Sequence, residues 1–165
     1  MTQSSSDAKW LSDEEMAAWR PFAMLASSVQ SSLEQDLLDD TGMPMVEYLI
    51  LMMLSEADGG ALRMCDVAAH VPLTPSGLTR RMDTMVRAGL VRRVTSGDDR
   101  RVVLAELTEQ GRARIEAAAP RHVEHVRRHF VDHIVDREDL ADLARILSRI
   151  VAAREAAAIA DPEPQ

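Results

Sequence analysis

Apolar residues recur at steps of three and four along most of the chain, which is the spacing of one face of an α-helix. Ser12 followed by Glu15 has the pattern of a capping box, so the first helix is predicted to begin there and to run to about Asp40. Pro21 removes a backbone donor and is expected to interrupt or kink this helix near Arg20. The far half of the helix carries an apolar seam made of Phe22, Leu25, Val29, Leu33 and Leu37.

The middle of the chain contains shorter elements. Residues 45–56 are apolar nearly all round and predict a buried central helix. After turn residues at 58–60, residues 61–63 are expected to form a short strand and residues 64–71 a short helix. Thr74 is a predicted N-cap with Pro75 at the first helical position, and Gly89 stands where a left-handed residue ends a helix. The buried stripe of this helix is predicted to be Leu78, Met82, Met85 and Val86.

Two β-rich runs follow that helix, at residues 90–95 and 102–107. Residues 96–99 between them have turn chemistry, so the two runs predict an antiparallel ribbon with arginines at its tip, which is a wing. Thr108 is the next predicted N-cap and opens a long helix toward Ile134, in which Pro120 is expected to produce a kink. Asp136 is predicted to cap the last helix, whose coiled-coil-like seam comprises Leu140, Leu143, Leu147, Ile150 and Arg154.

The exposed face of the helix that starts at Pro75 has the side chains of a DNA-reading surface. Ser76, Thr79 and Arg80 point away from the buried stripe, and short hydroxyls and arginines bond base edges and phosphates when a helix enters the major groove. The preceding short helix is joined to it through residues 72–74, which is helix-turn-helix geometry with the second helix as reader. The alternative interpretation of each feature alone is a solvated helix face and a charged hairpin tip.

A family resemblance becomes specific at the wing. The MarR family of bacterial transcriptional regulators carries an Asp-x-Arg wing signature leading into a strand that closes on Leu-Thr-x-x-Gly. This chain is similar to that family in the reading helix, in the Ala-Gly-Leu-Val-Arg-Arg run after it and in the whole wing, where it has Asp99-Arg100-Arg101 and then Leu107-Thr108-Glu109-Gln110-Gly111. The resemblance implies a mainly α fold with a small β-wing, in which long N- and C-terminal dimerisation helices flank a winged helix-turn-helix domain.

The predicted organisation follows from these elements and the resemblance. It comprises a flexible N-terminus (1–10), an N-terminal dimerisation helix region (11–42), the winged helix-turn-helix DNA-binding domain (43–107), C-terminal dimerisation helices (108–158) and a disordered tail (159–165). The long terminal helices have more apolar surface than one chain of this design covers, so we expect a homodimer.

The resemblance also implies roles for the wing residues. Arg101 is expected to enter the minor groove, where a narrow A·T tract concentrates negative potential, while Asp99 orients it or holds the turn. Arg63, Arg92 and Arg93 are expected to touch phosphates or simply to solvate the strand edge. The predicted DNA-binding set is Arg63, Thr74, Pro75, Ser76, Thr79, Arg80, Arg81, Arg92, Asp99, Arg100 and Arg101.

Three other groups of residues invite a functional interpretation. Trp19, Met45, Tyr48 and Met52 are candidates for lining a cleft for a small aromatic or phenolic ligand of the kind the family binds, although methionine at helical spacing more often fills a core. The stripe His122, His125, His129 and His133 precedes the apolar seam by one residue at each step, so a boundary role is favoured over zinc binding or pH sensing. Cys65 stands where a helix cap belongs, which disfavours a redox switch.

Composition limits what else the chain can be. Its 165 residues suit a single domain with elaborated ends, and its one Cys excludes an internal disulfide. With no signal-peptide pattern and no apolar run near 18 residues, a soluble cytoplasmic protein is predicted. The net charge of −8 is uneven: −9 over residues 1–62, +4 over residues 63–101 and −3 over residues 102–165. An acidic body with a basic face still binds DNA through the charges that face the phosphates.

These features predict a DNA-binding transcriptional regulator, most simply a repressor that binds a pseudo-palindromic operator and is released by a small ligand. A small helical enzyme is disfavoured, because no nucleophile and base pair, phosphate loop or metal set is recognisable, and no cofactor is expected. A winged-helix module that binds a protein partner instead of DNA remains the alternative. It predicts a basic face covered by an acidic partner.

Overall fold

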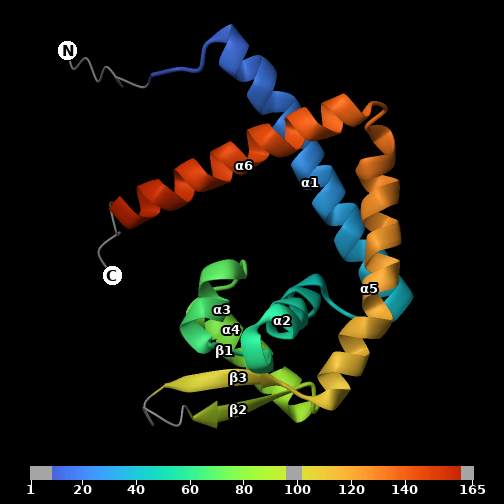
Figure 1. Cartoon of the computed structure of the whole chain (residues 1–165), viewed down its shortest axis with the longest axis vertical. Helices are drawn as coiled ribbons and strands as arrows, with labels where there is room; N and C mark the ends of the chain where they lie inside the picture. Colours follow the sequence, from blue (N-terminus) through green and yellow to red (C-terminus); the bar gives the residue numbers. More distant parts are fainter. Residues whose placement is uncertain (1–8, 96–101, 161–165) are drawn as a thin grey trace, which may run out of the picture. The chain divides into compact units, whose positions relative to one another are not determined.

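The computed structural model describes residues 9–95 and 102–160, which form helices and one small sheet (Figure 1). The chain divides into two compact units, the first ending at His125 and the second beginning at Val126. The predicted mainly α fold with a small β-wing is confirmed. In chain order the elements are α1 (Asp13–Thr41), α2 (Met45–Glu56), a 3₁₀ turn (Asp58–Gly60), β1 (Ala61–Arg63), α3 (Met64–His70), α4 (Pro75–Arg87), β2 (Val91–Thr95), β3 (Val103–Leu107), α5 (Glu109–His129), a second 3₁₀ turn (Val131–His133) and α6 (Arg137–Ala160).

The sheet has the order β1-β3-β2 and both pairings are antiparallel. The ribbon of β2 and β3 pairs Val91 with Leu107 and Thr95 with Val103, which confirms the predicted wing strands to within one residue. The short run 61–63 pairs as a third strand along β3, as expected from the sequence. The wing tip, residues 96–101, lies outside the described residues.

Helices α2, α3 and α4 gather beside this sheet, and the core forms between them (Figure 1). Leu51 and Leu54 of α2 and Met82 and Met85 of α4 are all fully buried. Leu78 is 3 % exposed and Val86 packs partly buried against the same cluster, so the predicted stripe of α4 is confirmed. The opposite face of α4 is thereby fixed toward solvent.

The helix ends follow local chemistry. Ser12 and Glu15 form the expected capping box, with Glu15 N donating to Ser12 Oγ at 3.2 Å and Ser12 N donating to Glu15 Oε2 at 2.8 Å. Thr74 Oγ1 accepts from Gly77 N at 3.2 Å, and Pro75 occupies the first helical position, where no donor is needed. Gly89 has φ of 71°, which confirms the left-handed residue predicted at this helix end.

Some boundaries differ from expectation. The helix is not interrupted at Pro21, because losing one donor leaves the bonds of the neighbouring turns intact. The helix begun at Glu109 likewise includes Pro120 but ends at His129, before the expected Ile134, and gives way to the 3₁₀ turn. The last helix extends to Ala160, inside the segment predicted as disordered tail, because its alanine-rich end has high helix propensity. Residues 161–165 lie outside the described residues.

Apolar side chains remain exposed on the terminal helices. On α1, Trp19 is 54 % exposed, Phe22 52 % and Leu25 51 %. On α6, Ile150 and Val151 are also more than half exposed. Exposed apolar side chains of this kind on the terminal helices are what the predicted homodimer requires. No helix of the described residues combines the length and apolar character needed to cross a membrane.

Candidate nucleic-acid interface

The two helices α3 and α4 are joined by a short turn in the expected helix-turn-helix order. The turn is held by a hydrogen bond from Leu73 N to Val71 O of 2.8 Å and by the Thr74 cap. Because the cap and Pro75 fix the first turn of α4 and the core fixes its buried stripe, the exposed face of α4 is presented on a rigid element.

That face carries the predicted reading residues. Ser76, Thr79 and Arg80 are all exposed. Thr79 Oγ1 donates to Pro75 O at 3.0 Å, so its hydroxyl proton is used within the helix while its methyl group and oxygen lone pairs stay available. No hydrogen bond or ion pair joins the Arg80 side chain to another residue that the structure describes. Arg80 therefore offers a guanidinium that no described carboxylate compensates, beside two small side chains, a combination suited to guanine or phosphate recognition.

The strand arginines are paired, in contrast to Arg80. Arg92 donates to Glu106 across the β2–β3 ribbon from both Nε (2.9 Å) and Nη2 (2.6 Å), and by donating it lowers the pKa of the Glu106 carboxyl below its ordinary value. Arg93 Nη1 lies 2.7 Å from Asp83 Oδ1 of α4. Arg92 was predicted to contact DNA, and its charge is already partly compensated by Glu106.

The remaining predicted DNA contacts are spread around this face. Arg63 is exposed at the end of β1 and precedes α3, while Arg81 on α4 is half-buried. Thr74 and Pro75 are exposed at the start of α4. The wing-tip residues Asp99, Arg100 and Arg101 lie outside the described residues, so their predicted roles stay predictions.

The Asp83–Arg93 pair joins the reading helix to the wing. Its side chains are 43 % and 37 % exposed, so water screens the attraction and a modest contribution is expected. A double-mutant cycle of Asp83→Ala and Arg93→Ala should give a coupling free energy of about 0.5–1 kcal/mol in urea unfolding. Added salt should reduce that coupling. A coupling of zero at low salt would contradict a stabilising role for the pair.

A small pocket of about 330 Å³ lies next to the wing, lined by Arg63, Met64, Cys65, Val102 and Val103. Cys65 is exposed there, and its Sγ lies 3.6 Å from Asp66 Oδ1. This is a different place from the ligand cleft predicted around α2.

The predicted ligand-lining residues are only partly brought together. Met45, Tyr48 and Met52 all lie on α2, where Tyr48 belongs to the core and the methionines pack against it. Trp19 lies on the N-terminal half of α1 and packs on Phe22, with ring centroids 6.0 Å apart. Tyr48 instead packs on His122 of α5, with ring centroids 4.4 Å apart. The described contacts therefore favour the core-filling interpretation for the three residues of α2.

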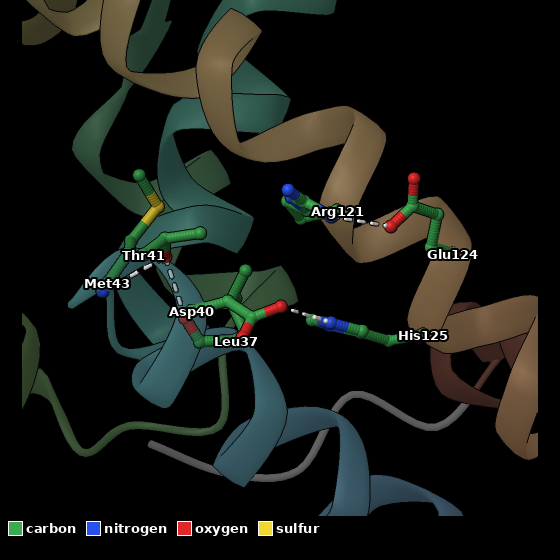
Figure 2. A network of polar contacts seen from close by, with 7 residues as sticks. All are labelled: Leu37, Asp40, Thr41, Met43, Arg121, Glu124 and His125. Carbon is green, nitrogen blue, oxygen red and sulfur yellow. Dashed lines mark hydrogen bonds and ion pairs between the residues drawn. The ribbon is translucent and has the colours of Figure 1, made fainter.

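His125 departs from the boundary position expected for the histidine stripe, whereas His122 and His129 are half-buried as expected. His125 is 1 % exposed, and its Nε2 lies 2.9 Å from Asp40 Oδ2 at the end of α1 (Figure 2). Val123, expected in the apolar seam, is instead 55 % exposed. His125 can be buried because a carboxylate partner satisfies its imidazole. The described residues include no group of three His, Cys, Asp or Glu side chains arranged to hold a metal.

The turn that presents Asp40 is tightly built (Figure 2). Thr41 Oγ1 donates to Leu37 O at 2.6 Å and accepts from Met43 N at 3.2 Å, and Gly42 ends the helix with φ of 63°. Nothing local in the sequence indicates that residues 40 and 125 meet, so only the tertiary structure shows this pair.

Protonation of His122 at acid pH is expected to destabilise the fold. Burial lowers the pKa of its imidazole below the ordinary value near 6.5, and His125 lowers it further, while Tyr48 packs on the ring. The unfolded chain therefore binds a proton at His122 more readily than the folded chain does. The fold is fully stable with respect to this group above about pH 6.5, and it loses stability as the pH falls.

The His122→Phe variant should therefore lose less stability than the wild type between about pH 7 and pH 5, measured as the urea midpoint. The matched control is His70→Gln, because His70 is exposed on α3. Identical pH profiles for His122→Phe and the wild type would show that His122 has no such effect.

The chain is similar to known proteins over most of its length. A model of the MarR family matches residues 41–102. The crystal structure of AbsC, a MarR family transcriptional regulator from Streptomyces coelicolor, is 38 % identical, with coverage of 90 % of this chain and 99 % of that one and a TM-score of 0.80. Sco3205, a MarR family regulator from the same organism solved in complex with DNA, is 33 % identical, with coverage of 89 % and 91 % and a TM-score of 0.78.

Curated relatives match over a shorter stretch. The HTH-type transcriptional repressor YetL of Bacillus subtilis is 33 % identical over 76 residues, which is 46 % of each chain. The matched segments span about half the length of the curated relatives, between 46 % and 62 %.

Proposed function

This chain belongs to the MarR family of transcriptional regulators, and from that membership we propose that it binds double-stranded DNA as a homodimer and represses transcription. In this proposal each subunit places α4 in a major groove and its wing in the adjacent minor groove. The two half-sites of the operator lie about one helical turn apart. Family membership places the chain among regulators and not among enzymes.

The observation that carries the proposal is the two-sided character of α4. Its buried stripe is locked into the core, while Ser76, Thr79 and Arg80 are exposed on the other side. Arg80 has no side-chain partner in the described part of the chain, whereas Arg92 and Arg93 are paired. Arg80 is therefore the residue that we assign to base recognition, with Ser76 and Thr79 beside it.

Two relatives support the proposal. Sco3205 was solved with DNA, and YetL is a repressor. Repression by this chain is inferred from the second of these. A cytoplasmic location follows from the proposed function, because the bacterial chromosome lies in the cytoplasm.

The homodimer is supported by the uncovered apolar side chains on α1 and α6. Trp19 and Phe22 are each more than half exposed in a single copy, as is Ile150. A second copy would bury such surfaces. Release by a small aromatic ligand remains part of the proposal only through the family resemblance, because Met45, Tyr48 and Met52 contact the core.

The salt dependence of binding tests the proposal against the protein-partner alternative. Binding of the purified chain to a mixed-sequence duplex is followed by fluorescence anisotropy at 50 and 200 mM salt. About four phosphate contacts would weaken binding roughly 100-fold over this range. Absence of binding to the duplex at 50 mM salt would contradict the proposal and favour a basic face reserved for an acidic protein. Sedimentation equilibrium of the same sample tests the dimer separately.

A further inference from the structure

The first turn of α5 is bonded to the end of the reading helix α4. We infer that Gly89, Leu90, Thr108 and Gly111 form a clamp that fixes the angle between α4 and α5 and thereby sets the half-site spacing that the dimer accepts. In this arrangement Thr108 and Gly111 are positioning residues, because they act on DNA recognition through α4. The inference rests on the proposed function.

Thr108 makes most of the clamp. Its Oγ1 lies 2.6 Å from Gly89 O and 3.0 Å from Leu90 O, so its single hydroxyl proton is shared between two carbonyls. Its backbone N also donates to Leu90 O at 3.2 Å. The same hydroxyl oxygen accepts from Gly111 N at 3.0 Å and so caps α5. One side chain thus caps its own helix and holds the end of another.

The two carbonyls that Thr108 holds are rigidly attached to α4. Gly89 N donates to Val86 O and Leu90 N donates to Met85 O, both at 3.0 Å. Gly89 adopts the left-handed conformation that this ending requires. A movement of the Gly89–Leu90 segment is therefore transmitted directly to the last turn of α4.

Gly111 permits the close approach between the two helices. It is buried, and a Cβ at this position would lie 2.0 Å from Leu90 O and 2.8 Å from Leu107 Cδ1. Both distances are below the separation of non-bonded atoms, and the nearer atom belongs to the backbone. Any side chain here would push α5 away from Leu90.

The clamp matters for DNA because of the periodicity of the duplex. Adjacent base pairs are about 3.4 Å apart along the axis, so half-sites separated by one base pair more or less require a different placement of the two reading helices. A rigid junction between α4 and α5 resists that adjustment, since α5 runs as one helix from Glu109 to His129. A loosened junction would accept several spacings.

Three substitutions at Thr108 separate capping from clamping. Thr108→Ser keeps both the cap and the donated hydroxyl. Thr108→Asp keeps an acceptor for Gly111 N but has no proton to donate to the carbonyls at neutral pH. Thr108→Val keeps the shape and loses both. The matched control is Ser55→Ala, which removes a hydroxyl that donates to Met52 O at 2.7 Å within α2 and joins no two elements.

The experiment measures relative affinities of the full chain for a series of inverted repeats whose half-site spacing changes by one base pair at a time. The half-site is taken from the duplex that the wild type enriches from a random pool. The ratio between the best spacing and its neighbours is the readout, because the charge added by Thr108→Asp affects all spacings alike and cancels. Circular dichroism of each variant confirms that it is folded.

In Thr108→Asp, we expect the affinity ratio between the best spacing and its neighbours to fall roughly five- to tenfold, which is the effect of one or two lost hydrogen bonds. Thr108→Ser and Ser55→Ala should keep the ratio of the wild type. Thr108→Val should behave like Thr108→Asp or be less stable. A folded Thr108→Asp with the wild-type spacing preference would overturn the inference, and so would an equal loss in Ser55→Ala. If the wild type itself selects no repeat, the proposed function fails, and that outcome is distinct from a failure of the clamp.

Discussion

Replacing Arg80 by alanine is expected to relax sequence preference at one position of each half-site. Arg80 is exposed on the face of α4 opposite the core, and its guanidinium has no partner among residues 9–95 and 102–160. A bidentate contact to a base edge contributes about 1–3 kcal/mol of discrimination against the wrong base. The affinity of Arg80→Ala for the best duplex should therefore fall toward its affinity for single-base variants, as measured by anisotropy.

The control for Arg80→Ala is Arg87→Ala on the same helix. Arg87 is also exposed, but it lies in the last turn of α4 and its Nη2 donates to Thr84 Oγ1 at 3.2 Å. Its removal should weaken all duplexes by a similar, smaller factor. If Arg80→Ala and Arg87→Ala gave the same uniform loss, Arg80 would be a phosphate contact and not a base-reading residue.

Arg101→Ala gives a different signature, because Arg101 is assigned to the wing tip through the family resemblance. We expect weaker binding to most sequences and a salt slope reduced by about one. Unchanged affinity and salt slope would contradict the wing assignment.

Replacing Met82 by alanine is expected to act on stability instead of sequence preference. Met82 is fully buried, on the face of α4 that packs into the core with Met85 and Leu78. Removing a buried methionine side chain takes away its transfer free energy and leaves a cavity, at a cost of about 2–5 kcal/mol. The urea midpoint should fall accordingly, while the folded fraction keeps the base preference of the wild type.

Arg87→Ala is again the control, since an exposed substitution on the same helix should change the free energy of unfolding by less than about 0.5 kcal/mol. A Met82→Ala variant as stable as Arg87→Ala would show that this face of α4 does not hold the core. Together the two faces of one helix predict two separable phenotypes.

Much of the fold could be predicted from local sequence chemistry. The caps at Ser12 and Thr74, the left-handed Gly89 and the stripe through Met82 each depend on residues within a few positions of one another, and the structure confirms all of them. Helix boundaries near Pro21 were predicted less well. A proline removes one bond, but whether a helix continues through it depends on packing that a single sequence does not show.

The contacts between distant segments were not predictable in this way. The Asp40–His125 pair joins residues far apart in the chain, and the periodicity of the histidine stripe did not predict that His125 is buried. The Leu-Thr-x-x-Gly motif that contains the clamp residues Thr108 and Gly111 can be recognised in the sequence. Only the structure shows that Thr108 bonds to Gly89 and that Gly111 lies against Leu90. For the interface, the exposed face of α4 was predicted, whereas the pairing of Arg92 with Glu106 required the register of the ribbon.

Sequence-specific DNA binding by a dimer can be tested directly by selecting bound duplexes from a random pool at moderate salt. We expect enrichment of an inverted repeat whose half-site centres lie about 10–11 base pairs apart. Failure to enrich any sequence, with only salt-sensitive generic binding or none at all, would contradict it.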